Sequence, residues 1–229
     1  GLTADKTFEG VGNLAMNLSY LPDMPVQINT PDLTTARVLE ANGVPAAAAQ
    51  GFATVPQDTI DYVYGSGNEV TGFQEFDIQR AEVTFTTVIP KLLGAQKTIV
   101  STQIGSEFIS DLPDQEDMRF RRHTNFGVGE LGEDGYVTDF SWGYQLTLKS
   151  TYANVIGPVA LTPSLTMKHG VEGYSSDDAL QEDERSLGLG VGMSYKKLSA
   201  DLSYTTYNDA KYSVVNDRDY LSLSTTYNF

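Results

Sequence analysis

The sequence contains no cysteine, no long apolar run and few basic residues, and each of these shortages excludes a class of protein. Without cysteine there are no disulfides, no thiolate metal sites and no cysteine nucleophile. No apolar run approaches the roughly 18 residues that a transmembrane helix requires. Only 15 Lys and Arg residues stand against 30 Asp and Glu residues, and the net charge of −15 excludes the basic surface that nucleic-acid binding requires.

The sequence does contain a regular alternation of apolar and polar residues, which recurs in eight segments. Successive side chains of a strand point to opposite faces, so each segment predicts a strand with one apolar and one polar face. The residues assigned to the apolar faces of these segments include no Asp, Glu, Lys or Arg. The predicted strands are residues 11–20, 76–89, 97–108, 139–153, 158–168, 185–195, 198–206 and 219–229.

The opposite face is polar and rich in small residues, including Gly188, Gly190 and Gly192 in one strand. Such a face suits the interior of a membrane barrel. A soluble sandwich would bury its apolar face against a second sheet and show a similar outer face, so alternation alone leaves both architectures open. The candidate interior residues are Arg80, Glu82, Gln103, Gln145, Lys149 and Asp201.

The lengths of the connections favour the barrel. The long connections are 21–75, 109–138, 169–184 and 207–218, and they alternate with the short connections 90–96, 154–157 and 196–197. Outer-membrane barrels have long extracellular loops and short periplasmic turns, whereas a sandwich has no physical reason to sort its loops by length. The sequence therefore predicts an all-β, antiparallel up-and-down transmembrane β-barrel in the bacterial outer membrane, with residues 1–229 forming a single barrel region.

Aromatic residues on the apolar faces gather near the strand ends, as expected for rings that prefer a membrane interface. The girdle near the short turns is predicted to contain Tyr152, Tyr195, Tyr227 and Phe229. The girdle near the long loops is predicted to contain Tyr20, Trp142, Tyr204 and Tyr207.

Catalytic sites are weakly indicated, and we predict neither enzyme activity nor a cofactor. His123 and His169 lie in or next to long loops, and nothing marks the serine partner that an esterase would need. Arg80 and Glu82 lie two residues apart on the polar face. They form either part of a charged constriction or a structural ion pair, and the ion pair is the favoured interpretation.

The long loops carry most of the acidic residues. Loop 169–184 has six carboxylates and no Lys or Arg, which could bind Ca²⁺, but the spacing matches no calcium motif and solvated acidic loops are favoured. In the first long loop, Thr30-Pro31-Asp32 precedes LTTARVLEAN and Gly43, which predicts a short helix. This helix either lies over the loops or folds inward and narrows a pore.

Several stretches resemble the outer-membrane proteins catalogued as domain of unknown function 1302. They are LSYLPDMPVQIN at 18–29, the segment from Tyr136 to Tyr174 that begins YVTDFSWGYQLTLKS, and LSADLSYTTYNDAKYSVVNDRDYLSLSTTYNF at 198–229. One position departs from the pattern, because Gly170 stands where the resemblance implies an acidic residue after His169. Members of this family are about twice as long, so the resemblance implies that this chain is the C-terminal half of a larger barrel.

The small interior residues lead independently to the same expectation. Side chains just fill the interior of an eight-stranded barrel, and rows of Gly, Ala, Ser, Thr and Asn would leave it underpacked. Strands 11–20 and 219–229 are therefore not expected to pair with each other.

Three functions remain open at this point. The first is an outer-membrane channel or transport component, with lipid or hydrophobic compounds as its cargo. The resemblance implies periplasmic and inner-membrane transport proteins as partners. The second is a general porin for small hydrophilic solutes. The third is a structural or adhesion barrel whose acidic loops contact lipopolysaccharide. The barrel-assembly machinery and outer-membrane lipid are expected partners in each case.

Phe229 allows a first test, because it resembles the C-terminal aromatic that barrel assembly recognises. Burial of a Phe side chain contributes about 1.5–3 kcal/mol. We expect deletion of Phe229, or Phe229→Asp, to lower the folded fraction measured by heat-modifiable gel migration. Asn228→Ser, on the opposite face, is the control and should leave the folded fraction unchanged. Equal folded fractions for the deletion and the intact chain would argue against a membrane strand at this position.

Overall fold

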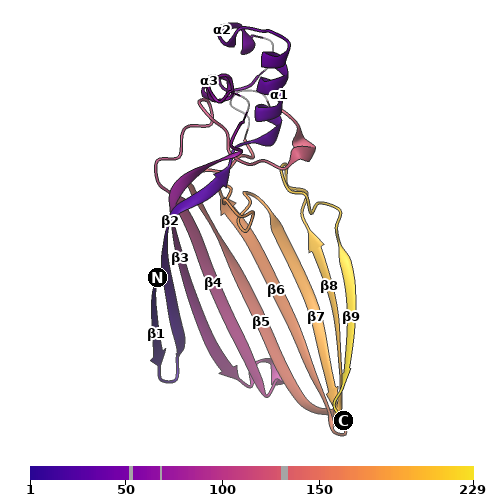
Figure 1. The fold of residues 1–229 in the computed structure, drawn as a ribbon. Helices are drawn as coiled ribbons and strands as arrows, with labels where there is room; N and C mark the ends of the chain where they lie inside the picture. The colour runs from indigo at the N-terminus through magenta and orange to yellow at the C-terminus, as the bar shows by residue number, and fades with distance from the viewer. Residues whose placement is uncertain (52–53, 68, 130–133) are drawn as a thin grey trace.

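The computed structural model describes residues 1–51, 54–67, 69–129 and 134–229, and within them nine antiparallel strands form one sheet. Each strand pairs with its neighbours in the sequence, so the topology is up-and-down from β1 to β9 (Figure 1). The strands are β1 Leu2–Phe8, β2 Gly12–Gln27, β3 Phe73–Pro90, β4 Lys97–Ile109, β5 Phe140–Ile156, β6 Val159–Glu172, β7 Arg185–Tyr195, β8 Leu198–Tyr207 and β9 Tyr220–Tyr227.

The sheet has one strand more than the eight that the alternation predicted. All eight predicted segments are strands, and β1 is the additional one. Its row Leu2, Ala4 and Phe8 is interrupted by Lys6, which hides the apolar alternation. Lys6 lies opposite Leu14 of β2, near the turn that joins the two strands, where its long side chain can extend toward water.

Strands β2 and β3 also extend further than predicted. The first long loop was predicted to begin at residue 21, but β2 continues to Gln27. The register shifts between Leu21 and Met24, and Asp23 adopts a positive φ of 52°. The bulge contains Pro22, which cannot donate to the ladder, and the strand resumes its pairing from Met24.

The register places the apolar residues of adjacent strands on one face. Leu146 lies opposite Met167, Leu165 opposite Leu189, and Leu202 opposite Leu223. Leu189 and Leu202 are 49 % and 41 % exposed, and the described residues contain no second sheet that could cover this face. We call it the apolar face. The polar face carries the expected residues Gln145, Thr166, Gly190 and Asp201, which lie opposite Lys168, Gly188, Ser164 and Gly192.

The two outermost strands each have one partner among the described residues. Strand β1 pairs with β2, and β9 pairs with β8, so the sheet order runs from β1 to β9 without a ladder that joins its ends. As expected, β2 and β9 do not pair with each other in the part of the chain that the structure describes.

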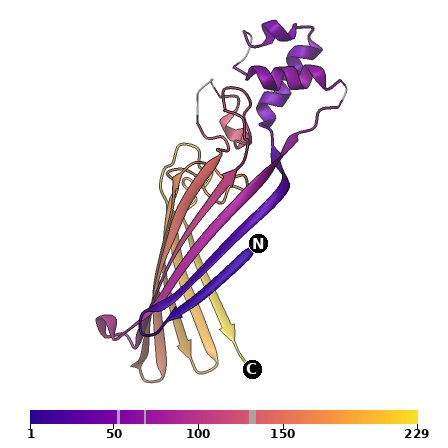
Figure 2. The same ribbon diagram turned by 90° about the vertical axis from the view of Figure 1, so that its left-hand side faces the viewer.

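The connections segregate by length, as predicted. We call the end with the long connections 28–72, 110–139, 173–184 and 208–219 the loop end. The opposite end, the turn end, has the short connections 9–11, 91–96, 157–158 and 196–197. Figures 1 and 2 show the three helices above the loop end of the sheet and the C-terminus at the turn end.

The helices lie in the first long connection. They are α1 Thr30–Ala41, α2 Ala46–Ala49 and α3 Gln57–Gly65, and two 3₁₀ turns, η1 Leu92–Gly94 and η2 Thr124–Phe126, lie elsewhere. The predicted helix is α1, although Asn29 rather than Thr30 occupies the N-cap. It packs against α3 above the sheet. None of the described helices combines the length and apolarity needed to cross a membrane.

A buried ion pair joins the helices to the next long loop. Arg119 and Asp32 are both fully buried and form a bidentate pair, with Nε–Oδ2 and Nη2–Oδ1 distances of 2.9 and 2.7 Å. Arg119 also donates to the carbonyls of Thr54 and Gly129. Removing one member of such a pair would leave an uncompensated buried charge, so the pair fixes the two loops to each other.

Most of the aromatic residues predicted for the apolar face lie on that face, and Tyr207 is an exception. Trp142 donates to Glu172 at the loop end, and Tyr227 lies 5.2 Å from the ring of Phe229 at the turn end. Tyr152 and Tyr195 also lie toward the turn end. Tyr207 lies on the polar face, because it is paired with Ser186, which shares that face of β7 with Gly188 and Gly190.

Candidate functional site: a loop fixed to the polar face

The candidate interior residues divide between two cavities on the polar face. Arg80, Glu82, Gln103 and Gln145 line a cavity of about 470 Å³ near the loop end, together with residues of loop 173–184. Lys149 and Asp201 instead line a separate cavity of about 230 Å³ beside the glycine row of β7. The structure thus brings four of the six residues together.

Arg80 of β3 and Glu107 of β4 both line the larger of these cavities, near the loop end. The two residues are directly opposite in the antiparallel register, and Arg80 Nε and Nη2 lie 2.7 and 2.6 Å from Glu107 Oε2. The Glu107 side chain is buried, which makes an ionised partner necessary. The ion pair expected for Arg80 therefore exists, but its partner is Glu107 and not Glu82.

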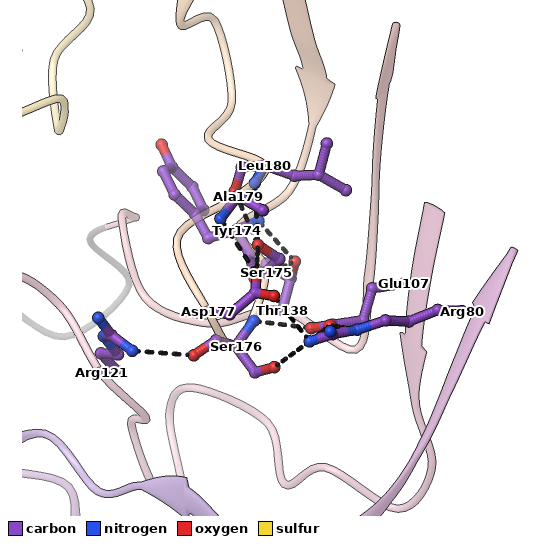
Figure 3. Close-up of polar contacts among 10 residues, drawn as sticks. All are labelled: Arg80, Glu107, Arg121, Thr138, Tyr174, Ser175, Ser176, Asp177, Ala179 and Leu180. Carbon is purple, nitrogen blue, oxygen red and sulfur yellow. Dashed lines mark hydrogen bonds and ion pairs between the residues drawn. The ribbon is translucent and has the colours of Figure 1, made fainter. Parts of the chain in front are cut away.

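Loop 173–184 folds over this pair and binds both of its members. The backbone N–H of Ser176 donates to Glu107 Oε1 over 2.7 Å, and Asp177 Oδ2 lies 2.9 Å from Arg80 Nη2. From the other side, Arg121 donates to the carbonyl of Ser176 and pairs with Asp178. Figure 3 shows Ser176 between Arg121 and the Arg80–Glu107 pair. The loop is thus held to the sheet wall by charge-assisted hydrogen bonds.

Two glycines in the sheet allow the loop to approach this closely. Gly143 of β5 and Gly170 of β6 are paired on the polar face. A Cβ on Gly170 would lie 2.0 Å from the carbonyl oxygen of Gln181, and one on Gly143 would lie 3.0 Å from the Leu180 side chain. The glycine at position 170, where the family resemblance implied an acidic residue, is therefore explained by the loop backbone that rests on it.

The loop is also ordered by its own hydrogen bonds. Asp177 Oδ1 accepts from the Ser175 hydroxyl and the Ala179 N–H over 3.0 and 3.1 Å. Partial burial of Asp177 opposes its ionisation, but these two donors and the Arg80 guanidinium outweigh that effect and lower its pKa. Burial raises the pKa of Tyr174, whose N–H donates to the Thr138 hydroxyl at the base of the loop.

The acidic residues of this loop mostly have protein partners. Asp177 pairs with Arg80, Asp178 with Arg121, and Asp183 with Arg185. No group of three or more His, Asp or Glu residues among the described ranges is arranged to hold a metal ion. His123 caps the turn η2 by accepting from the Asn125 N–H, and His169 lies on the apolar face opposite Tyr144.

Sequence reasoning missed the residues that complete this site. Glu107 and Arg121 were given no role, and Asp177 was counted among the solvated carboxylates of loop 169–184. The antiparallel register of β3 and β4 was the available signal for Glu107, because it sets Arg80 opposite Glu107. No local pattern indicated that the loop folds onto the sheet.

The fold and this site together define a class: an all-β protein whose meandering sheet has an exposed apolar face and a polar face that one of its own loops partly covers. Comparison with known families gives a match over residues 1–229, the whole chain, to a family described as a protein of unknown function (DUF1302). The chain belongs to this family. No curated protein and no solved structure matches it.

The glycine pair gives a test of the loop position. We expect Gly170→Ala to displace loop 173–184, because the new Cβ meets the Gln181 backbone, and overpacking of this kind costs about 1–3 kcal/mol. Glutamyl endopeptidase cleavage after Glu182 and Glu184 in the folded protein should accelerate. Gly105→Ala is the matched control, because it lies on the same face with no atom within 4 Å of the added Cβ. Equal cleavage of the two variants would show that the glycine pair does not position the loop.

The lowered pKa of Asp177 gives a pH test. Its folded pKa lies below the ordinary 3.8, so its contribution to loop docking is complete above pH 3.8 and is lost as the pH falls through the lower folded value. A fluorophore on Ala179→Cys, in a chain otherwise free of cysteine, should report release of the loop in that acidic range. Asp177→Asn should remove this transition. The same label at Lys197→Cys serves as a control, and a transition that persists in Asp177→Asn would contradict the assignment.

Proposed function

We propose that this chain forms part of the wall of an outer-membrane β-barrel channel or transport component, in which loop 173–184 narrows the passage along the polar face. The observation that carries the proposal is the exposed apolar face of a nine-stranded sheet whose long connections all lie at one end. Lipid is the solvent that would stabilise such a face, and the segregated loops match the two sides of an outer membrane.

The distribution of charge on the apolar face supports the membrane assignment. The middle rows of the face are uncharged, and the charges occur near the ends of the strands. Lys6 lies near the turn end, and Asp77, Glu172 and Arg185 lie near the loop end. A basic side chain costs about 2–4 kcal/mol at the bilayer midplane but only about 0–1 kcal/mol near the interfaces.

The open edges of β1 and β9 bear on how the barrel closes. In hydrocarbon every backbone N–H and C=O needs a partner, so a membrane sheet cannot leave its edges unpaired. We therefore propose that additional strands, from a longer form of this chain or from another polypeptide, pair with β1 and β9. The small residues of the polar face are consistent with the wider interior that more strands would create.

The polar lining favours one kind of cargo. Arg80, Glu107 and Asp177 place fixed charges on the polar face where loop 173–184 covers it. Such a lining favours small hydrophilic solutes, as in a general porin, which is the second candidate function. A lipid or hydrophobic cargo, with periplasmic and inner-membrane transport partners, is supported by the family resemblance.

Conductance across planar bilayers tests the proposal. The reconstituted protein, which should show heat-modifiable gel migration, is compared with Arg80→Ala and Asp177→Asn. Each variant removes the ion pair between wall and loop, so we expect higher conductance and more frequent transitions to the open level. Asp177→Asn keeps Arg80 as the cationic partner of the buried Glu107, whereas Arg80→Ala removes that partner.

The control is Arg37→Ala, which removes a charge from α1, where Arg37 pairs with Glu40 away from the polar face. It should leave the conductance unchanged. A protein that inserts but conducts identically in all four forms would exclude a gating role for the loop. A protein that fails to insert in any form would exclude the membrane assignment itself.

A further inference from the structure

A row of polar side chains crosses three neighbouring strands on the apolar face. Tyr144 of β5 lies opposite His169 of β6, and His169 lies opposite Arg185 of β7, so the three form a row across neighbouring strands. All three are on the apolar face, at its loop end. We call this row the polar row.

Hydrogen bonds connect the polar row and leave donors available. Arg185 Nε donates to His169 Nε2 over 3.1 Å, which makes Nε2 an acceptor and places the ring proton on Nδ1. Nδ1 lies 3.4 Å from the Tyr144 hydroxyl oxygen, which then accepts, so the Tyr144 O–H can donate elsewhere. The Arg185 side chain is 59 % exposed, and its ion pair with Asp183 is a long one of 3.7 Å. Glu172, the other nearby carboxylate, accepts from Trp142.

Aliphatic side chains continue the same three strands toward the middle of the sheet. The row next to the polar row is Leu146, Met167 and Leu187, and the one beyond it is Leu148, Leu165 and Leu189. A depression of about 640 Å³ runs along this surface, and Met167, Leu187 and Thr206 line it together with the polar row. Cationic and hydroxyl donors therefore stand directly above a strip of apolar surface.

We propose that Arg185 and Tyr144, positioned by His169, bind the phosphate group of a lipid A molecule whose acyl chains run along the strands across the two aliphatic rows. The guanidinium offers its terminal N–H groups to phosphate oxygens, and the Tyr144 hydroxyl adds a third donor. His169 positions both partners, because it holds Arg185 through Nε2 and Tyr144 through Nδ1. The chain's strong negative charge makes an exposed arginine at this point of the apolar face unusual, and an anionic headgroup is its complement.

This inference rests on the proposed membrane-spanning function, which places the loop end in the outer leaflet. The site lies where the strands leave the apolar region, at the level of lipid headgroups. An arginine there costs little in a bilayer, and the two aliphatic rows follow one another below it along the strands, which is the direction that acyl chains would take.

The test measures lipid binding to the intact protein in detergent by native mass spectrometry. The probes are lipid A with two phosphates and the same lipid after enzymatic removal of its phosphates. We expect Arg185→Gln to bind phosphorylated lipid A roughly tenfold more weakly, the loss of about one charge-assisted contact, and to bind the dephosphorylated lipid as the wild type does. Arg185→Lys should be intermediate, because it keeps the charge and loses the planar fork.

The matched control is Arg218→Gln, which removes an exposed arginine at the same end of the sheet but outside the polar row. Equal losses in Arg185→Gln and Arg218→Gln would show general electrostatic attraction and overturn the site. If Arg185→Gln weakens the binding of both lipids equally, Arg185 does not recognise the phosphate. If millimolar inorganic phosphate displaces the phosphorylated lipid A, the site binds a soluble anion instead.

The outcome also separates this inference from the proposed function. Heat-modifiable migration and insertion into bilayers report membrane integration without reference to lipid A. Integration without Arg185-dependent lipid A binding overturns the phosphate site alone. Failure to integrate overturns the proposed function and the lipid site with it.

Discussion

The antiparallel register is the constraint on which the other features of the structure depend. Side chains alternate with a period of two, so a slip of one residue in any strand would exchange its apolar and polar faces. The observed register aligns the aliphatic rows of β5, β6 and β7 and at the same time sets Arg80 opposite Glu107. Because both faces are specified, a slipped strand would place charges on the apolar surface and leave Glu107 without its partner.

Strand β6 and the loop that follows it carry both of the sites described above. His169 points to the apolar face, and the adjacent Gly170 points to the polar face. The N–H of Gly170 donates to the carbonyl of Glu184, one residue before Arg185. The same short segment of backbone therefore supports the base of the loop, the glycine on which the loop rests and the polar row. A change in the β6–β7 connection would affect both faces of the sheet.

Much of the fold could be predicted from the sequence, because alternation is a local property. It identified eight strands, their faces and the segregation of the loops. It failed where the pattern was broken: Lys6 interrupts the apolar row of β1, and a bulge between Leu21 and Met24 interrupts the alternation of β2. Tyr207 was assigned to the apolar face although its odd position in β8 places it on the polar face with Ser186.

The site was less accessible to sequence reasoning, because its contacts are not local. Arg80 was predicted as an interior residue. Its partner Glu107 lies 27 residues further along the chain, and Asp177, which binds it from the loop, lies almost a hundred residues further. The contact between Gly170 and the Gln181 backbone depends on how the loop folds, which no periodicity encodes. The family pattern even suggested an acidic residue at that position, whereas the packing of this chain requires the absence of a side chain.

The arginines gather at one end of the sheet, whereas the lysines do not. Every arginine, from Arg37 in α1 to Arg218 before β9, lies at or above the loop end, while Lys6, Lys91, Lys97, Lys196 and Lys197 lie at the turn end and Lys211 lies at the loop end. Arginine has a planar fork that binds carboxylates and carbonyls in several directions at once, and lysine is a flexible point charge. Arg119 uses this fork to join two loops, and Arg80 uses it to join the sheet to a third. In a chain with twice as many acidic as basic residues, the arginines are placed where one cation can hold several acceptors, and the acidic loops are ordered around them.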